Sequence, residues 1–412
     1  MAFDRRTLVG RRERASELTT TTTATGRATS RRRELAESLG PAWIAMIADV
    51  DAPSILTAAT VGAAYGYGLI WFFLLLTVPL FFIQEASGRI GIATSRGLGE
   101  VIRGSFSRKV AVLASLPMAA VDVVSYVAEY TGIAIGMELV GVPPVVSMPL
   151  AYLAHLALVR RKKFVAVEKL LFAVSLVLIV SYAGALLARG VHASSPVRLS
   201  DSPSYLFLLA ASAGAVVMPF MLFYQASATA KKGTVRTWAM RAETLAGAAA
   251  SEVGMVVIVM ATAGLATTVS FADPRSLALA LSSIAGAYAP YLFALGLVAA
   301  AFLALVVISL ASSWAVVEAM GWRDDRFFRV YVAESLPAVA VPILFPDPLS
   351  LVLNLMVLSV FVLAGPGILA GIIASSPRIM GAQASGARWR AAYWLSLAAV
   401  LAFGVVAVAA AL

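Results

Sequence analysis

The chain has 412 residues, of which 60% are hydrophobic and only 13% charged, and its mean hydropathy is +0.88. A soluble domain of this size could not cover its surface with so little charge, so a membrane protein is predicted. The lack of cysteine excludes disulfides and thiolate metal sites, and the only two histidines, His155 and His192, exclude a His-rich zinc site. The net charge of +10 comes from basic residues in loops, so no nucleic-acid partner is expected.

Residues 1–40 are polar and basic, and they include a low-complexity threonine run, Thr19 to Thr23. No apolar segment follows the first basic cluster, which excludes a cleaved signal peptide. We expect 1–40 to be a disordered basic cytoplasmic tail and 41–412 to form a transmembrane domain.

After residue 40 the apolar runs reach the length of about 20 residues that a helix needs to cross the hydrocarbon core. The sequence therefore predicts an all-α integral membrane protein with eleven transmembrane helices. Their expected ranges are 41–62, 66–87, 110–137, 144–159, 164–187, 204–229, 240–267, 280–311, 329–346, 349–373 and 390–411.

The basic residues test this count, because connections on the cytoplasmic side of a bilayer are enriched in Lys and Arg. With the N-terminus inside, only three of the 32 basic residues fall in outer connections, namely Arg189, Arg198 and Arg275. Adding or removing one helix would scramble this alternation. We therefore predict a multi-pass protein of the cell membrane, in a bacterium the inner membrane, with a cytoplasmic N-terminus and the lipid bilayer as its surroundings.

The count of eleven also implies two halves of opposite orientation. Helices 1 to 5 would form one repeat over 41–187, helices 6 to 10 a second over 204–373, and 390–411 an extra helix. Secondary transporters often have such inverted repeats, with the substrate bound where the first helix of each repeat is broken.

The first of these helices contains two acids and a proline. Asp49 and Asp51 lie in the middle of the hydrophobic span, and Pro53 removes a backbone donor and opposes regular helix. Unwound backbone exposes carbonyl groups, which together with a carboxylate make an oxygen-rich cation site. The alternative is a kinked helix whose acids pair with a basic residue elsewhere, although no Lys or Arg is evident in the interior of any helix.

The sixth helix has a corresponding interruption at Pro219, next to Met218. A thioether is a soft ligand that suits transition metals better than Mg²⁺ or Ca²⁺. The alternative is that Met218 only packs, as most membrane methionines do. Its position at the matching break of the second half favours the ligand.

Four segments together resemble the NRAMP family of divalent-metal transporters, and the resemblance extends over nearly the whole chain beyond residue 40. The helix 1 run from Asp51 to Ser54 resembles the family's Asp-Pro-Gly-Asn, and the stretch 61–71 resembles the segment that follows it. Met218-Pro219-Phe220 stands where the family has Met-Pro-His, and Gly-Ile-Ala-Thr at 91–94 is similar as well.

The resemblance implies a LeuT-like fold of two inverted five-helix repeats plus one helix, with helices 1 and 6 broken. It implies that Asp51 and Met218 bind the metal, that Ser54 stands in place of the family's Asn, and that a backbone carbonyl at Ala215 completes the site. Glu129 matches the helix 3 glutamate that the family uses in proton movement. The metal ion would be the substrate, and no cofactor is expected.

Three departures from the family bear on the chemistry. Phe220 removes a histidine that could titrate near neutral pH, Ser54 offers one hydroxyl in place of an amide carbonyl, and Asp49 adds an acid to the metal site. These changes resemble a divergent NRAMP-related branch in which some relatives carry Mg²⁺. Those relatives lack the methionine, however, and this chain keeps it.

Other polar residues inside the spans have weaker assignments. Asp122 and Glu129 are seven residues apart, near one face of a helix, and are candidates for a proton path. Asn354 either supplies a further ligand or contributes to helix packing, and His155 is expected to be packed or hydrogen-bonded rather than a ligand. Glu252 and Glu334 are further buried acids, whereas Glu85 and Glu318 are expected to form interfacial ion pairs.

The sequence thus favours a secondary-active divalent metal-ion transporter of the Mn²⁺/Fe²⁺ type, working by alternating access, with proton coupling left open. The first alternative is a transporter of Mg²⁺ or another cation on the same fold. The second is a transporter-like membrane sensor, although the low-complexity tail offers no output domain. An enzyme is not expected, because no nucleophile–base pair, phosphate loop or cofactor motif is evident.

Overall fold

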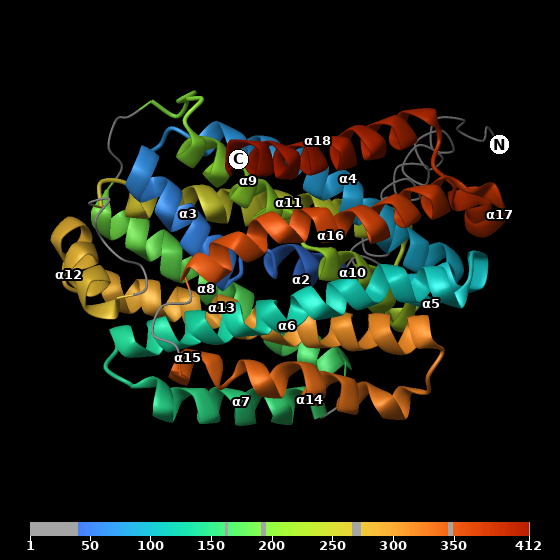
Figure 1. Ribbon diagram of the computed structural model, residues 1–412, viewed down its shortest axis with the longest axis horizontal. Coiled ribbons are helices and arrows are strands. Elements are labelled where there is room, and N and C mark those ends of the chain that lie inside the picture. Colours follow the sequence, from blue (N-terminus) through green and yellow to red (C-terminus); the bar gives the residue numbers. More distant parts are fainter. Residues whose placement is uncertain (1–39, 161–163, 191–194, 266–272, 345–348, 412) are drawn as a thin grey trace, which may run out of the picture.

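The computed structural model describes residues 40–160, 164–190, 195–265, 273–344 and 349–411. The predicted tail over 1–39 and His192 lie outside these residues. All regular secondary structure in the described ranges is helical, and the long helices run along the longest axis of the molecule (Figure 1).

The predicted helices are all present in the described chain, with shifted ends and a few short helices between them. In chain order they are α2 (Pro41–Ile47), α3 (Ala52–Tyr65), α4 (Ile70–Thr94), α5 (Leu98–Ser105), α6 (Arg108–Leu139), α7 (Pro144–Arg160), α8 (Phe164–Arg189), α9 (Pro203–Val216), α10 (Pro219–Lys232), α11 (Thr237–Thr262), α12 (Pro274–Ala285), α13 (Ala289–Met320), η1 (Asp324–Arg326), α14 (Phe327–Ala338), α15 (Val341–Leu344), α16 (Leu349–Ser375), α17 (Pro377–Met380), η2 (Gly381–Gln383) and α18 (Ala387–Ala411).

Most of these helices have the length and composition of membrane spans. Eight spans of the described chain are long and apolar enough to cross a bilayer singly, and the bent pair α2–α3 makes a ninth. The other two predicted spans correspond to α7 and α8, whose apolar stretches Pro144–Arg160 and Ile179–Arg189 are shorter. The predicted all-helical membrane fold is therefore confirmed, with eleven as an approximate count.

Both predicted interruptions are present, and each has a local cause. The chain bends by 45° between α2 and α3, and Asp51 caps α3 by accepting a hydrogen bond from the Ser54 N–H at 2.8 Å. Pro53 fits there because the first turn of a helix has no intrahelical use for its missing N–H. At the second break, Met218 is the N-terminal cap residue of α10 and Pro219 is its first residue.

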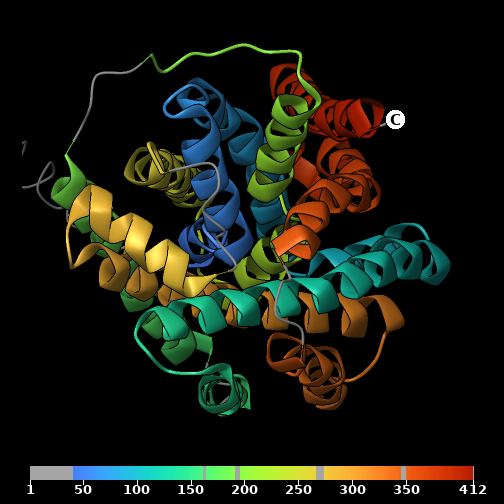
Figure 2. The same ribbon diagram turned by 60° about the vertical axis from the view of Figure 1, so that its left-hand side comes forward.

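The broken helices lie in the middle of the molecule. In Figure 1, α2 and α10 are surrounded by α3, α11, α13 and α16, and Figure 2 shows α7 and α14 at the outer margin. The side chains of α10 from Pro219 to Thr229 are buried, as are those of α3 from Ala52 to Ala59. The breaks are therefore shielded from lipid by other helices.

The predicted helix over 280–311 is wrong at both ends. Gly286, with φ of +82°, ends α12 in a left-handed turn, and α13 then begins at Ala289 and continues to Met320. Glycine tolerates this conformation because it has no Cβ. The polar end of α13 packs against α5 and α10, so Ser312 and Ser313 are buried inside the protein rather than ending a span.

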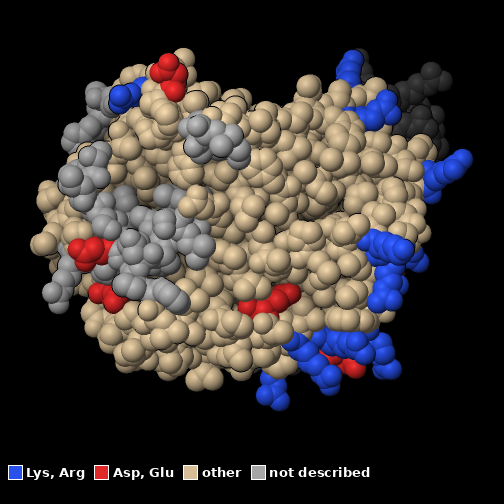
Figure 3. Space-filling view, viewed as in Figure 1, with Lys and Arg blue, Asp and Glu red and all other residues tan. Residues whose placement is uncertain are grey.

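Charge is distributed unevenly along the long axis. On the face shown in Figure 3, Lys and Arg side chains gather at one end of the molecule, where α5 and α17 lie in Figure 1. The alternating loop charges in the sequence thus correspond to one basic end in the structure, and this end is called the basic end below.

The helices approach most closely at glycines. A Cβ added at Gly91 of α4 would lie 2.3 Å from the carbonyl oxygen of Ala226 in α10, so the two backbones are in direct contact there. Small residues at such crossings are the usual means by which membrane helices pack tightly.

We predict that Gly91→Ala destabilises the protein by forcing α4 away from α10, at a cost of about 1–3 kcal/mol for overpacking. Thermal unfolding in detergent measures this change. Gly365→Ala is the matched control, because that glycine lies within α16 with no atom inside 4 Å of the added Cβ. Equal melting temperatures for the two variants would contradict the close crossing.

Candidate metal-ion site

The site is built around Asp51, at the start of α3. Its side chain is fully buried, and Oδ1 accepts the Ser54 N–H as the helix cap. The other oxygen, Oδ2, has no hydrogen-bond partner in the described part of the chain. An unpaired buried carboxylate oxygen is costly, so this atom is available to a cation or a proton.

Ser54 connects the two breaks. Its hydroxyl donates a hydrogen bond to the carbonyl oxygen of Ala215 at 3.3 Å, across from α3 to the end of α9. That carbonyl is free of its usual helical partner because residue 219, four positions later, is a proline without an N–H. The structure therefore brings Asp51, Ser54 and Ala215 together, and places the buried Met218 three residues beyond Ala215 at the same break.

Glu129 of α6 reaches the same break. Its Oε2 accepts the Ala52 N–H at 3.1 Å, which satisfies a backbone donor at the start of α3. Its Oε1 has no partner among the described residues, and the carboxyl groups of Glu129 and Asp51 are close enough for a hydrogen bond when one of them is protonated. The two acids form a pair that needs a proton or a cation between them.

The ligands available at this place are mixed in kind. In the described ranges, no three His, Cys, Asp or Glu side chains lie close enough together to hold a metal ion. Metal binding at the breaks would thus depend on a carboxylate together with a hydroxyl, a carbonyl and a thioether. A thioether ligand favours softer divalent ions over Mg²⁺ and Ca²⁺.

Comparison with known proteins identifies the family. The model of the Nramp family, described as natural resistance-associated macrophage protein-like, matches residues 42–410. The chain belongs to the NRAMP family. It is therefore a member of a family of metal-ion transporters and not an enzyme, as its sequence motifs indicate.

Two curated relatives agree with this assignment. The chain is 28% identical to the divalent metal cation transporter MntH of Verminephrobacter eiseniae over 391 residues, covering 89% of this chain and 88% of the relative. It is also 28% identical to MntH of Bacillus subtilis over 217 residues, a match that spans about half, 51%, of each chain.

A solved structure confirms the fold. A crystal structure of the Eremococcus coleocola manganese transporter, in complex with an aromatic bis-isothiourea substituted compound, matches with a TM-score of 0.73 at 16% identity. The match covers 91% of this chain and 86% of the transporter. The predicted LeuT-like arrangement of this NRAMP chain is thereby shown.

Asp49 lies on the other side of the first break. Its Oδ2 accepts a hydrogen bond from the Ser251 hydroxyl of α11 at 2.8 Å, and the fully buried Glu252 is an acidic neighbour. Within the described residues, Asp49 Oδ1 and both carboxyl oxygens of Glu252 have no hydrogen-bond partner. The structure therefore directs Asp49 toward α11, whereas Asp51 is directed toward α3 and α6.

The α16 residue that reaches the second break is Ser359 rather than Asn354. The side chain of Asn354 is exposed, whereas the Ser359 hydroxyl is buried and lies 3.0 Å from the carbonyl oxygen of Gly214. A Cβ at Gly214 would lie 1.9 Å from the Met356 carbonyl oxygen, so α9 and α16 touch there. Ser359 is not among the residues singled out from the sequence. Its only signal there is that it is a polar residue five positions after Asn354 in the same predicted helix.

Asp122, the second predicted proton-path residue, lies in a separate buried region of α6. Asp122 is buried, and it shares the neighbourhood of the Ser312 hydroxyl with Glu334 of α14. Asp122 Oδ2 and Glu334 Oε2 have no hydrogen-bond partner among the described residues. Asp122 of α6 and Glu334 of α14 thus form a second pair of buried acids. The sequence assigns Asp122 to a proton path and gives Glu334 only as a further buried acid.

His155 is a hydrogen-bonded residue of the core, as predicted. Its Nδ1 lies 3.0 Å from the Tyr130 hydroxyl and its Nε2 lies 2.8 Å from the Ser309 hydroxyl. Ser309 donates to the Leu305 carbonyl at 2.6 Å and accepts from Tyr126. His155 therefore carries its proton on Nε2, and both ring nitrogens are occupied by protein groups.

The two acids expected to form interfacial ion pairs differ. Glu85 pairs with Arg89 and with Arg241, as predicted, and is buried. Glu318 accepts a hydrogen bond from the Ser227 hydroxyl at 2.9 Å, and Lys231 lines the same pocket without an ion pair to it in the described structure. The prediction of an ion pair for Glu318 is wrong because the extended α13 buries this residue against α5 and α10.

We predict that His155→Phe lowers stability and leaves metal affinity unchanged, because the phenyl ring leaves the Tyr130 and Ser309 hydroxyls without their partner. The expected loss is about 1–3 kcal/mol for each polar group left unsatisfied. Thermal unfolding and Mn²⁺ titration of the purified protein measure the two quantities. Loss of Mn²⁺ affinity at unchanged stability would instead indicate a ligand role for this histidine.

Proposed function

We propose that this NRAMP chain is a secondary-active transporter that takes up divalent metal ions, with Mn²⁺ and Fe²⁺ as its substrates. The observation that carries the proposal is the hydrogen bond from Ser54 to the Ala215 carbonyl beside the buried Asp51. It joins the broken helices of both halves at one point, where secondary transporters bind their substrates. The relatives named for divalent metal cation and manganese transport support the choice of substrate.

Each group at the breaks has a distinct role in this proposal. Asp51 supplies the charge that attracts the ion, and its free Oδ2 is the first ligand. Ser54 and the Ala215 carbonyl exchange their mutual hydrogen bond for bonds to the metal. Met218 supplies the soft ligand that selects transition metals. Asp49 adds negative charge from the side of α11 and does not itself coordinate the ion.

Proton movement accompanies metal binding in this proposal. Asp51 and Glu129 share a proton in the empty site, and a divalent ion at Asp51 displaces it. Asp122, on the same helix α6, and its neighbour Glu334 of α14 offer the next protonatable groups. Because Lys and Arg are enriched on the cytoplasmic side of membranes, the basic end faces the cytoplasm. The N-terminus is then cytoplasmic as well. Movement of one half against the other then gives alternating access.

We predict that Asp51→Asn weakens Mn²⁺ binding by more than about 100-fold, which exceeds the loss expected for an outer partner of a metal ligand. Asp49→Asn is the matched variant, because it removes the same charge two residues away on the side of α11. Its expected loss is about tenfold or less. Isothermal titration and Mn²⁺ flux into proteoliposomes measure both. Full transport by Asp51→Asn would disprove the site, and equal losses would place Asp49 among the ligands.

Replacing the thioether tests the identity of the ion. In Met218→Ala, Mn²⁺ transport should fall and Mg²⁺ should become an effective competitor, with a selectivity change of about tenfold. The measurement is Mn²⁺ flux in the presence of a large excess of Mg²⁺. If the wild-type protein already transports Mg²⁺ as well as Mn²⁺, the chain is a Mg²⁺ carrier of the same fold. The serine in place of asparagine and Phe220 in place of histidine give that alternative its basis.

A further inference from the structure

A partly exposed arginine near the basic end is held rigidly on two sides. The Nε of Arg241, on α11, donates to Glu85 Oε1 at 2.8 Å, and its guanidinium carbon lies 4.4 Å from the ring centre of Trp389 on α18. The side chain is nevertheless 37% exposed. The bond to Glu85 thus holds one edge of the guanidinium group and Trp389 covers one face. The outer edge remains accessible.

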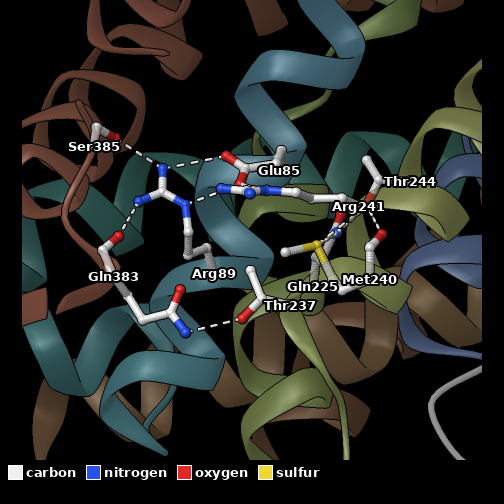
Figure 4. A network of polar contacts seen from close by, with 9 residues as sticks. All are labelled: Glu85, Arg89, Gln225, Thr237, Met240, Arg241, Thr244, Gln383 and Ser385. Atoms are coloured by element: carbon white, nitrogen blue, oxygen red, sulfur yellow. Dashed lines mark hydrogen bonds and ion pairs between the residues drawn. The ribbon is translucent and has the colours of Figure 1, made fainter. Parts of the chain in front are cut away.

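The negative charge of Glu85 is already used by a second arginine. The buried Arg89 donates to Glu85 from Nε at 2.9 Å and from Nη2 at 3.2 Å, and its remaining donors reach the Gln383 carbonyl and the Ser385 hydroxyl. Figure 4 shows both guanidinium groups converging on the one carboxylate. Two positive charges and one negative charge leave a net charge of +1, and it resides on the exposed member, Arg241.

The open edge of Arg241 is a prepared anion site. In the described structure neither of its terminal nitrogens has a hydrogen-bond partner, whereas every nitrogen of Arg89 has one. Two parallel N–H groups of a guanidinium match the oxygens of a phosphate group. Because stacking and the Glu85 bond already fix the group, little side-chain freedom remains to be lost when an anion binds.

The surface next to Arg241 is apolar and aromatic. One turn toward the centre of α11, Leu245 is 51% exposed, and one turn toward the basic end, Trp238 is 43% exposed. Trp389 packs edge-on against Phe82 of α4, so an aromatic group lines the other side. Tryptophan is the residue typical of the headgroup level of a membrane. An anion bound here therefore lies between apolar groups at the depth of lipid headgroups.

We infer that Arg241 and Trp389 form a binding site for the phosphate of an anionic phospholipid in the leaflet at the basic end. The fork of Arg241 binds the phosphate, Trp389 and Trp238 flank the headgroup, and the acyl chains extend along Leu245. Free phosphate has no apolar part that could contact Leu245 and the two tryptophans. The exposed Arg388 and Arg390, next to Trp389, favour a lipid with net negative charge over a zwitterionic one.

The test is native mass spectrometry of the full chain released from nanodiscs that contain phosphatidylglycerol and phosphatidylcholine. The wild-type protein should retain phosphatidylglycerol, and Arg241→Gln should bind it at least about tenfold more weakly, as expected for loss of a charge-assisted pair. Arg378→Gln is the matched control, because it removes an exposed positive charge at the same end that has neither a stacked ring nor a carboxylate partner among the described residues. Its retention should equal that of the wild type.

Two further measurements keep the test decisive. Arg241→Lys retains the charge but not the fork, so it should bind phosphatidylglycerol at an intermediate level even if the glutamine variant folds poorly. Inorganic phosphate at millimolar concentration should not displace the lipid. Equal retention by wild type and both Arg241 variants would overturn the inference. So would an equal loss in Arg378→Gln, because that result would mean attraction by the general charge of this end.

Discussion

Peptide groups inside a membrane protein have no water to bond to, so each interruption of a helix must be satisfied by other parts of the protein. This chain interrupts two helices at its centre, and the surrounding helices supply the missing partners. Asp51 caps α3 from within, Glu129 of α6 accepts the Ala52 N–H, and Ser54 donates to the Ala215 carbonyl. The bonds that allow the helices to break are therefore made by the same side chains that are candidates to bind the metal.

The same requirement separates two kinds of buried acid. Glu85 has two arginine partners, and its charge is compensated by the protein itself. Asp51, Glu129 and Glu252 each keep at least one carboxyl oxygen without a hydrogen-bond partner in the described ranges. Burying such groups without compensation is costly, so in the proposed function a mobile proton or metal ion supplies the missing charge there. The compensated acid holds helices together, and the uncompensated ones are the candidates for the proposed transport path.

Close packing fixes the distance between the breaks and their surroundings. Gly214 allows α16 to touch the end of α9, and Gly132 allows α6 to approach the start of α3, where an added Cβ would lie 2.2 Å from that of Ala52. Contacts this tight transmit a shift of one helix to the next, because packed interiors resist compression. A change at Asp51 therefore reaches α6 and α16 directly. In the proposed function, these contacts would couple ion binding to movement of the two halves.

The sequence alone determined the membrane fold, the positions of both breaks and the residues at them, because these depend on local chemistry. Long apolar runs must be helices in lipid, Pro53 and Pro219 cannot donate backbone hydrogen bonds, and Asp51 is a natural helix cap. Resemblance to the NRAMP family rested on the same short segments. These features are readable because neighbouring residues in the chain produce them.

Only the tertiary structure decided which distant groups meet. It directed Asp49 to Ser251, placed Ser359 rather than Asn354 at the second break, and buried Glu318 against Ser227 on a helix longer than predicted. Each of these contacts joins residues that are far apart in the chain, or in the case of Ser359 depends on how one helix is rotated against its neighbour. A hydrophobic run gives the length of such a helix approximately, but when the helix is apolar on all sides the run does not give its rotation. The packing of side chains between helices sets that rotation, and with it the site.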